Sequence, residues 1–310
     1  MTEPAVTILL ATCNGERWLS EQIRSIVGQS YSHWRLFVSD DNSSDNTVDL
    51  LSAFVGRDER ISLLPAREGP PGHVANFEYL LETVESLDPG RGIVFLADQD
   101  DIWCPDKLQT LVDVLDNSPI DAAAVFSDLE LMDADGVLSG SYLGSLGLLP
   151  PENMAALIAR NSVTGCSMAF RTGLLDVALP FPPRLENHDW WLGMCAMSTS
   201  GLAYSHRKLV SYRQHGANAI GANNLPGQLL RIGHLVRRQN RVIESKLIAM
   251  SSLEDRLSSR GLPVPGSLTR YRLAFSGKNR FATCWQLLTG EFKPGSTRLL
   301  LTQLISVLLR

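Results

Sequence analysis

The chain has 310 residues, of which 44% are hydrophobic and 20% charged, so it can bury a sizeable core and is neither disordered nor fibrous. Its net charge of −5 hides an asymmetry, because residues 226–310 carry 14 Lys and Arg against 4 Asp and Glu, whereas residues 1–225 carry 14 against 29. An acidic body argues against general nucleic-acid binding. The five cysteines form no CxxC pair, which argues against a disulfide framework and a structural zinc site.

Short apolar runs alternate with helical patterns up to residue 126. This alternation predicts an α/β fold with a largely parallel sheet. The first apolar run is short and follows no basic stretch, so we expect no signal peptide and a cytoplasmic protein. In chain order we expect strands at 6–11, 34–39, 61–64, 93–97 and 122–126, and helices at 18–27, 47–54, 76–84 and 105–115.

Polar clusters follow three of the expected strands. They are Thr12-Cys13-Asn14, residues 40–45 (DDNSSD) and residues 98–101 (DQDD). Ligands of α/β sheets collect beyond the carboxyl ends of the strands. The sequence therefore predicts a binding site built from these three loops.

The DQDD cluster is the most informative of the three, because carboxylates this close together repel one another unless a cation neutralises them. Asp98 and Asp100 form a DxD pair, and residues two apart can point the same way. Mg²⁺ and Mn²⁺ prefer oxygen ligands, so the pair can face one such ion or the sugar and phosphate groups around it. The alternative is a turn followed by a helix cap, which we favour for Asp106, and Asp101 is given no role.

Two later segments contain further candidates. In ENHDWW, Asp189 is followed by Trp190 and Trp191, so it can be a desolvated base between flat surfaces on which sugars stack, or a helix N-terminal acid beside core aromatics. In YRQHGAN, His215 can ligate a metal or contact a phosphate, although a lone histidine is more often structural. The remaining histidines receive only that structural interpretation: His33, His73, His206 and His234.

The composition and the spacing of apolar residues change near residue 225, where we place a domain boundary. The stretch from residue 227 to 257 has apolar residues at helical spacing with interleaved arginines, including Arg231, Arg237, Arg238 and Arg241. The terminal TRLLLTQLISVLLR falls short of the roughly 20 residues that span a bilayer. A basic helical region of this kind can contact anionic lipid at the inner face of the cytoplasmic membrane or pack on the acidic body, and both alternatives stay open.

Taken in order, VTILLATCNGE, VSDDNSSDNT, FLADQDDIWCPDKL, NSVTGCSMAFR, ENHDWW and YRQHGAN resemble the family 2 inverting glycosyltransferases of the GT-A fold. The resemblance covers roughly residues 4 to 220 and is nearest to the bacterial rhamnosyltransferase-like branch. It implies a nucleotide-diphospho-sugar transferase fold, a Rossmann-like mixed sheet flanked by helices, with residues 226–310 as a mainly helical C-terminal appendage.

The resemblance also assigns roles by position. Asp41 matches the acid that contacts the pyrimidine base, Asp100 the ligand of the Mg²⁺ or Mn²⁺ ion and Asp189 the catalytic base. Many members have Glu before the base, whereas this chain has His188, which leaves open how the pKa of Asp189 is tuned. The remaining matches are Thr12, Asn14, Glu16 and Asp98 for the nucleotide, Gly72, Asn76 and Phe77 beneath the donor sugar, Gly165 and Cys166 near the acceptor, and His215 in the loop over the donor.

The implied reaction transfers a sugar from a dTDP- or UDP-linked donor to a hydroxyl of a saccharide or lipid-linked saccharide, as in cell-surface polysaccharide assembly. Similarity of FLADQDDIW and YRQHGAN to the rhamnosyltransferase-like branch suggests rhamnose. A nucleotidyltransferase acting on sugar phosphates is the chemical alternative, but the chain lacks the GxxxxGK[ST] loop that would hold a triphosphate. A noncatalytic nucleotide-sugar-binding protein is the alternative from another class.

Overall fold

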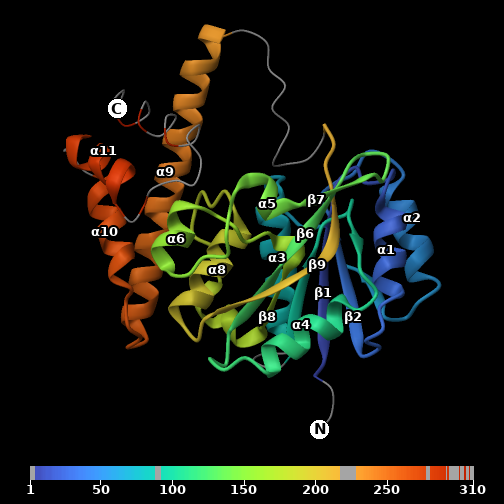
Figure 1. The fold of residues 1–310 in the computed structure, drawn as a ribbon. Coiled ribbons are helices and arrows are strands. Elements are labelled where there is room, and N and C mark those ends of the chain that lie inside the picture. The colour runs from blue at the N-terminus through green and yellow to red at the C-terminus, as the bar shows by residue number, and fades with distance from the viewer. Residues whose placement is uncertain are drawn as a thin grey trace.

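The computed structural model describes residues 4–87, 92–216, 228–276 and 280–290, together with residues 292, 300, 304 and 307. Its described part is centred on a nine-stranded mixed sheet with helices on both faces (Figure 1). The strand order is β3-β2-β1-β4-β8-β6-β9-β5, and β7 pairs with β6. The strands are β1 (Val6–Thr12), β2 (Trp34–Asp40), β3 (Ile61–Leu63), β4 (Ile93–Ala97), β5 (Ile102–Trp103), β6 (Ala124–Met132), β7 (Leu138–Ser141), β8 (Met168–Arg171) and β9 (Leu202–Arg213).

The helices surround this sheet in two layers. In the first half of the chain they are α1 (Leu19–Val27), α2 (Thr47–Val55), α3 (His73–Leu87) and α4 (Lys107–Asp116). The second half adds α5 (Tyr142–Leu146), α6 (Met154–Ala159), α7 (Leu175–Ala178), α8 (His188–Ser198), α9 (Gln228–Ser259), α10 (Gly266–Phe275) and α11 (Arg280–Thr289), with short 3-10 turns at Gly165–Ser167 and Thr172–Leu174.

Strand β1 shows how the sheet divides the core. Successive side chains of a strand point to opposite faces. Leu9 accordingly packs in one apolar cluster with α3, whereas Ile8 and Leu10 pack in the other with α1 and α4. A continuous apolar run is therefore required here, because both faces of the strand are covered by helices.

The largely parallel sheet that the sequence predicts is present in one half of the molecule. Strands β3, β2, β1 and β4 are parallel, as the alternation of strands and helices requires. The strand at Ala124–Met132 does not continue this series, because β8 lies between it and β4 and is antiparallel to both. β8 has four residues and follows a 3-10 turn, too short for its periodicity to be read from the sequence.

The C-terminal helices α9 and α10 pack on the sheet domain rather than standing apart from it (Figure 1). Apolar residues of α9, including Ile243, Met250, Leu253 and Leu257, belong to the same core cluster as α6 and α8. Of the terminal apolar stretch only Leu300, Leu304 and Val307 are described, and Val307 is buried in that cluster. None of the helices in the described ranges combines the length and apolarity needed to cross a bilayer.

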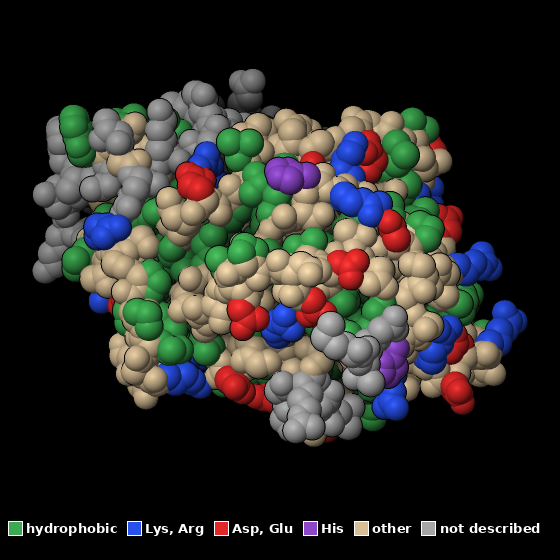
Figure 2. All heavy atoms as spheres, turned by 60° about the horizontal axis from the view of Figure 1, so that its bottom comes forward, with side chains coloured by type: hydrophobic (Ala, Val, Ile, Leu, Met, Phe, Trp, Pro, Cys, Tyr) green, Lys and Arg blue, Asp and Glu red, His purple; other side chains and the backbone are tan. Residues whose placement is uncertain are grey.

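Several basic side chains of α9 are used inside the molecule. Lys246 Nζ donates to the carbonyl of Ile158 at 2.7 Å, and Arg256 donates to the carbonyls of Val177 and Pro180 at 2.7 and 2.5 Å. On the face shown in Figure 2, Lys and Arg side chains are interspersed with Asp and Glu side chains. Some basic side chains of the C-terminal region therefore hold α9 against the acidic body.

Candidate active site

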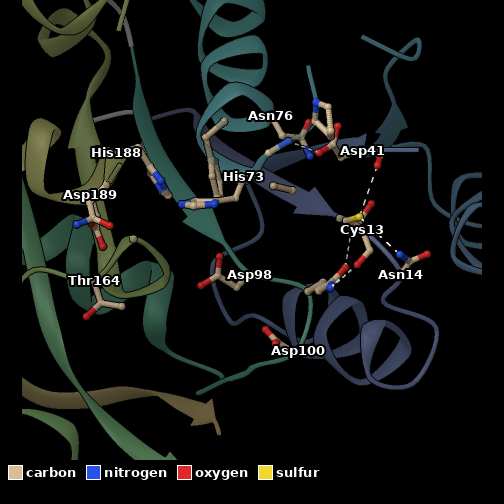
Figure 3. A pocket seen from close by; sticks show the side chains of 18 of the residues that line it. Cys13, Asn14, Asp41, His73, Asn76, Asp98, Asp100, Thr164, His188 and Asp189 are labelled. Carbon is tan, nitrogen blue, oxygen red and sulfur yellow. Dashed lines mark hydrogen bonds between the residues drawn. The ribbon is translucent and has the colours of Figure 1, made fainter. Parts of the chain in front are cut away.

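A cavity of about 620 Å³ opens at the carboxyl ends of β1 and β4. In Figure 3, Asp98 and Asp100 lie on one side of it and Asp189 on another, with His73 between Asp189 and the residues Asp41 and Asn76. Eleven of the residues proposed from the sequence line this cavity: Thr12, Asn14, Asp41, Gly72, Asn76, Phe77, Asp98, Asp100, Gly165, Asp189 and His215.

The loop after β1 is fixed to the loop after β2. Asn14 has a φ of 50°, a left-handed conformation that asparagine tolerates better than most residues. Its backbone N–H donates to Ser43 Oγ at 2.7 Å, and its side-chain Oδ1 accepts from the N–H of Ser44 at 2.8 Å. The hydroxyl of Thr12 donates to Asp40 at 2.9 Å. The two loops therefore form one preorganised wall of the cavity.

Gln99, the middle residue of the DxD pair, joins this wall to the acidic loop. Its side-chain amide accepts from the N–H of Cys13 at 2.8 Å and donates to the carbonyl of the same residue at 2.9 Å. A Cβ at Gly15 would lie 2.3 Å from Gln99 Oε1, so the close approach requires glycine. The two hydrogen bonds fix the relative position of the loops that follow β1 and β4.

Asp41 is buried in an ion pair that the sequence did not reveal. Its carboxylate accepts from Arg67 Nη2 at 2.5 Å and from the N–H of Gly72 at 2.7 Å. Gly72 has a φ of 145°, which a residue with a side chain rarely adopts. Each carboxylate oxygen retains a lone pair, because an ionised carboxylate can accept about four hydrogen bonds. Asp41 can therefore still accept from a ligand in the cavity.

The carboxylates after β4 are crowded as the sequence predicts. Burial and the charges of Asp100 and Asp189 raise the pKa of Asp98 to about 7. Asp101 is fully buried, and burial raises its pKa well above its ordinary value. Its Oδ1 accepts from the N–H of Arg213, while Oδ2 has no partner among the described residues. A bound cation would relieve the repulsion at the exposed end of this loop.

A buried cation already lies at the inner end of the loop. Lys107 is fully buried, donates to the carbonyl of Cys166 at 2.6 Å and lies 3.2 Å from the centre of the Trp103 ring. Burial lowers its pKa to about 7, opposed by the nearby charges of Asp101 and Asp98. Asp98, Asp101 and the Cys166 thiol have donor atoms within 4.8 Å of one another, but Lys107 already supplies positive charge to that cluster. We therefore assign Asp101 and Cys166 to structure, whereas Asp98 also lines the cavity.

At the outer end of the loop Asp100 lies beside His215, the other residue proposed from the sequence as a metal ligand. His215 Nε2 lies 2.7 Å from Asp100 Oδ2, and its ring stacks on Trp18 with 4.1 Å between centroids. Asp98 and Asp100 face the same cavity, and their oxygens are the donors that Mg²⁺ and Mn²⁺ prefer. These residues fit a divalent cation, with His215 orienting Asp100.

Asp189 lies in the first turn of α8 on the wall opposite this pair. Its side chain accepts from the N–H of Trp190 at 2.6 Å and from Asn161 Nδ2 at 3.2 Å. Burial raises the pKa of Asp189 to about 6, although these hydrogen bonds oppose the shift. A general base works best when its pKa lies near the operating pH, so Asp189 is well placed to accept a proton.

Comparison with known proteins shows which family the chain belongs to. The chain is 30% identical to the dTDP-rhamnosyl transferase RfbG of Shigella flexneri over 74% of its own length and 80% of that protein. The model of the family "Glycosyl transferase family 2" matches residues 7–146. The chain belongs to glycosyltransferase family 2. Another relative of this glycosyltransferase is the UDP-Glc:alpha-D-GlcNAc-diphosphoundecaprenol beta-1,3-glucosyltransferase WfgD of Escherichia coli, 28% identical over 63% of this chain and 71% of WfgD.

Solved structures show that the glycosyltransferase has the GT-A fold. The complex of S. aureus TarS 1-349 with UDP-GlcNAc matches 93% of this chain and 88% of that chain, with a TM-score of 0.55 and 13% identity. The mannosyltransferase PcManGT from Pyrobaculum calidifontis, in complex with GDP-Man and Mn²⁺, matches 94% and 74% with a TM-score of 0.54 and 17% identity. The predicted mixed sheet flanked by helices is thereby confirmed.

The prediction that Trp190 and Trp191 stack on sugars is wrong. Both rings are buried in the core and lie outside the cavity lining, and each indole N–H donates to a backbone carbonyl, one of α6 and one of α7. Lys246 lies over the ring of Trp190 at 4.9 Å and Arg256 over that of Trp191 at 5.2 Å. The tryptophans instead bind α8 to the C-terminal helix α9.

Two acidic residues make contacts that differ from those predicted. Glu16 is exposed and lies outside the cavity lining, where its carboxylate accepts from the backbone and side chain of Asn46 at the start of α2. Glu16 therefore fixes a loop and does not line the cavity, where we expected it to contact a nucleotide. Asp106 precedes α4 as predicted but makes no side-chain cap, because it pairs with Arg207 at 2.7 Å.

Several residues that contact or line the site of this glycosyltransferase were not predicted from the sequence. Arg67, Gln99 and Asn161 become partners of site residues only through contacts between segments 26 to 86 positions apart. His73 received a structural interpretation, yet it lines the cavity. The sequence did contain one indication for Lys107, because a lysine that follows closely after a cluster of acids is a candidate counter-charge.

Proposed function

We propose that the protein is an inverting glycosyltransferase that uses Asp189 as its base. The observation that carries this proposal is the placement of one carboxylate, with its pKa raised to about 6, in the same cavity as the Asp98 and Asp100 pair but on a different element, helix α8. Inversion by one displacement requires a base for the acceptor and a separate site for the departing diphosphate. The two groups of acids meet these requirements on different walls.

The residues divide the work as follows. Asp189 accepts the proton of the acceptor hydroxyl, held in place by the amide of Asn161. Asp98 and Asp100 would hold a Mg²⁺ or Mn²⁺ ion, with His215 positioning Asp100. The ion, when bound, supplies positive charge for the diphosphate leaving group. Burial of the base limits access of water, which would otherwise compete with the acceptor.

The donor is proposed to be a dTDP- or UDP-linked sugar. Asp41 directly follows β2 and lines the cavity, where a carboxylate can accept the N3–H that uracil and thymine share. The relative RfbG is named as a dTDP-rhamnosyl transferase, and this supports dTDP-rhamnose as the first donor to test. The relative WfgD is named for a diphosphoundecaprenol-linked acceptor, which supports a saccharide or lipid-linked saccharide acceptor in polysaccharide assembly.

The test measures release of nucleoside diphosphate from dTDP-rhamnose, UDP-glucose, UDP-GlcNAc and GDP-mannose, with Mn²⁺ and after chelation. We expect turnover of a dTDP- or UDP-linked donor that stops on chelation. Asp189→Asn should abolish transfer and leave Mn²⁺-dependent binding of the donor intact. Release of pyrophosphate from dTTP and a sugar 1-phosphate would instead identify a nucleotidyltransferase, and normal transfer by Asp189→Asn would refute the base assignment.

We further propose that the C-terminal region touches the inner face of the cytoplasmic membrane, which would bring the cavity near a lipid-linked acceptor. Arg238 and Arg241 are exposed on α9, and Trp285 and Leu288 are exposed on α11. Because α9 shares the core, removal of residues 226–310 would expose apolar surface. The test therefore uses full-length Arg238→Glu/Arg241→Glu in flotation with anionic liposomes, and flotation equal to that of the unmodified chain would contradict membrane contact through these arginines.

A further inference from the structure

His188 is a buried polar side chain without a partner. Only 7% of its surface is exposed, and neither ring nitrogen has a hydrogen-bond partner among the described residues. Buried polar groups are nearly always hydrogen-bonded, so an unpaired histidine in a cavity wall points to a group that binds there. His188 lines the same cavity as Asp189.

The ring of His188 is held in a fixed orientation. It stacks on Phe77 with 4.2 Å between centroids and an interplanar angle of 27°, and the edge of His73 approaches it at 6.0 Å. On the other side, a Cβ at Gly165 would lie 2.9 Å from His188 Nε2. Only glycine at position 165 permits this close approach, and the stacked ring cannot turn freely to find another partner.

The chemistry of the ring limits which ligand group it can bind. Burial lowers the pKa of His188 to about 3, so the imidazole is neutral at physiological pH. A neutral imidazole offers one N–H donor and one nitrogen acceptor. This combination suits a hydroxyl, which also donates and accepts, and provides no positive charge for a diphosphate.

The position of His188 favours the donor sugar over the acceptor. The ring rests on Phe77 of α3, and α3 begins one residue after Gly72, whose N–H binds Asp41. In Figure 3, His188 and His73 lie between Asp189 and the Asp41 region of the cavity. A sugar that links a nucleotide near Asp41 to the attacked carbon near Asp189 would pass beside this ring.

We propose that His188 is a specificity-determining residue that hydrogen-bonds a hydroxyl of the transferred sugar. This proposal rests on the glycosyltransferase function proposed above. The proposal assigns a role to the position directly before the base, where this chain has His188 and many family members have glutamate. His188 acts on the neutral sugar, while the acids after β4 act on the diphosphate.

The test compares His188→Phe with the unmodified protein by calorimetric titration of dTDP, dTDP-rhamnose, UDP and UDP-GlcNAc in the presence of Mn²⁺. Phenylalanine retains the stacking on Phe77 and removes both hydrogen bonds. We expect the affinity for the preferred nucleotide sugar to fall about tenfold, because phenylalanine cannot form the hydrogen bonds to the sugar hydroxyl. The affinity for the nucleoside diphosphate should change less than about twofold. His188→Gln, which retains a donor and an acceptor, should restore part of the discrimination.

A ligand-side measurement keeps the test decisive if His188→Phe does not fold. Monodeoxy analogues of the preferred donor sugar are titrated into the unmodified protein and His188→Gln. Removal of the recognised hydroxyl should weaken binding to the unmodified protein about tenfold and weaken binding to His188→Gln less. Equal losses in both proteins for every analogue, or unchanged sugar binding by His188→Phe, would overturn the proposal for His188. An unmodified protein that binds none of the nucleotides would overturn the proposed function itself.

Discussion

Replacement of Asp189 by asparagine should stabilise the protein at the same time as it abolishes transfer. The Asp189 side chain is 93% buried, and burial raises its pKa from 3.8 to about 6. Asparagine has nearly the same shape and retains an oxygen that can accept from Asn161 and from the N–H of Trp190. The substitution therefore removes a buried charge with little change in packing.

The size of the effect follows from the shift in pKa. A carboxyl whose pKa is raised in the folded state favours folding only when it is protonated, so its ionisation lowers the stability as pH rises from about 4 through 6. A pKa of Asp189 raised from 3.8 to about 6 corresponds to about 3 kcal/mol of unfolding free energy at pH 8. At pH 5 the same relation leaves about 1.6 kcal/mol, and below pH 4 the difference disappears.

Urea unfolding of both proteins without divalent cation, at pH 8 and pH 5, measures this difference. We expect Asp189→Asn to be more stable by at most about 3 kcal/mol at pH 8, with the advantage smaller by about 1.4 kcal/mol at pH 5. The transfer rate of the unmodified enzyme should fall as pH decreases through about 6, because the base becomes protonated. An asparagine variant that is less stable at pH 8, or equally stabilised at both pH values, would refute this account of Asp189.

Three further substitutions test other parts of the site. Gly165→Ala would place a Cβ 2.9 Å from His188 Nε2, so kcat/KM with the preferred donor should fall at least about tenfold and Tm should also fall, because the stacked ring cannot turn freely; full activity and an unchanged Tm would contradict the tight fit. Arg67→Met removes the cation paired with buried Asp41 and should lower the unfolding free energy, measured in urea, by about 3 kcal/mol. Adding Asp41→Asn should restore part of this stability, and a double variant no more stable than Arg67→Met would exclude the unpaired buried charge as the cause. Arg256→Met removes hydrogen bonds to two carbonyls near α7 and should cost about 2 kcal/mol in the same assay, whereas exposed Arg238→Met should cost almost nothing.

Much of the fold is encoded locally. Apolar runs such as residues 93–97 and the helical patterns between them place the parallel half of the sheet, because burial on both faces requires continuous apolar strands. The same local patterns bring the ends of β1, β2 and β4 to one edge, so Thr12, Asn14, Asp41 and Asp98 could be expected near one another. Strand β8 could not be predicted in this way, because its place between β4 and β6 is set by pairing with distant segments.

The tryptophans show where local reasoning fails. Trp190 and Trp191 directly follow Asp189, and their sequence position suits sugar stacking as well as a core helix. Only the tertiary structure shows that α9 and two neighbouring helices cover them. A side chain on a helix can face solvent or core within one step of the chain, so proximity in sequence to a site residue does not place it in the site.

The sequence by itself determined the order of the site loops, their acidic character and the candidate base, because these depend on residue type and on the alternation of strands and helices. The tertiary structure decided which charges are paired and which are left for a ligand. Arg67 neutralises Asp41, Lys107 lies beside the inner acids, and the outer carboxylate pair faces the cavity with Asp189 across from it. Charge pairing depends on distances between segments far apart in the chain, and those distances exist only once the sheet has formed.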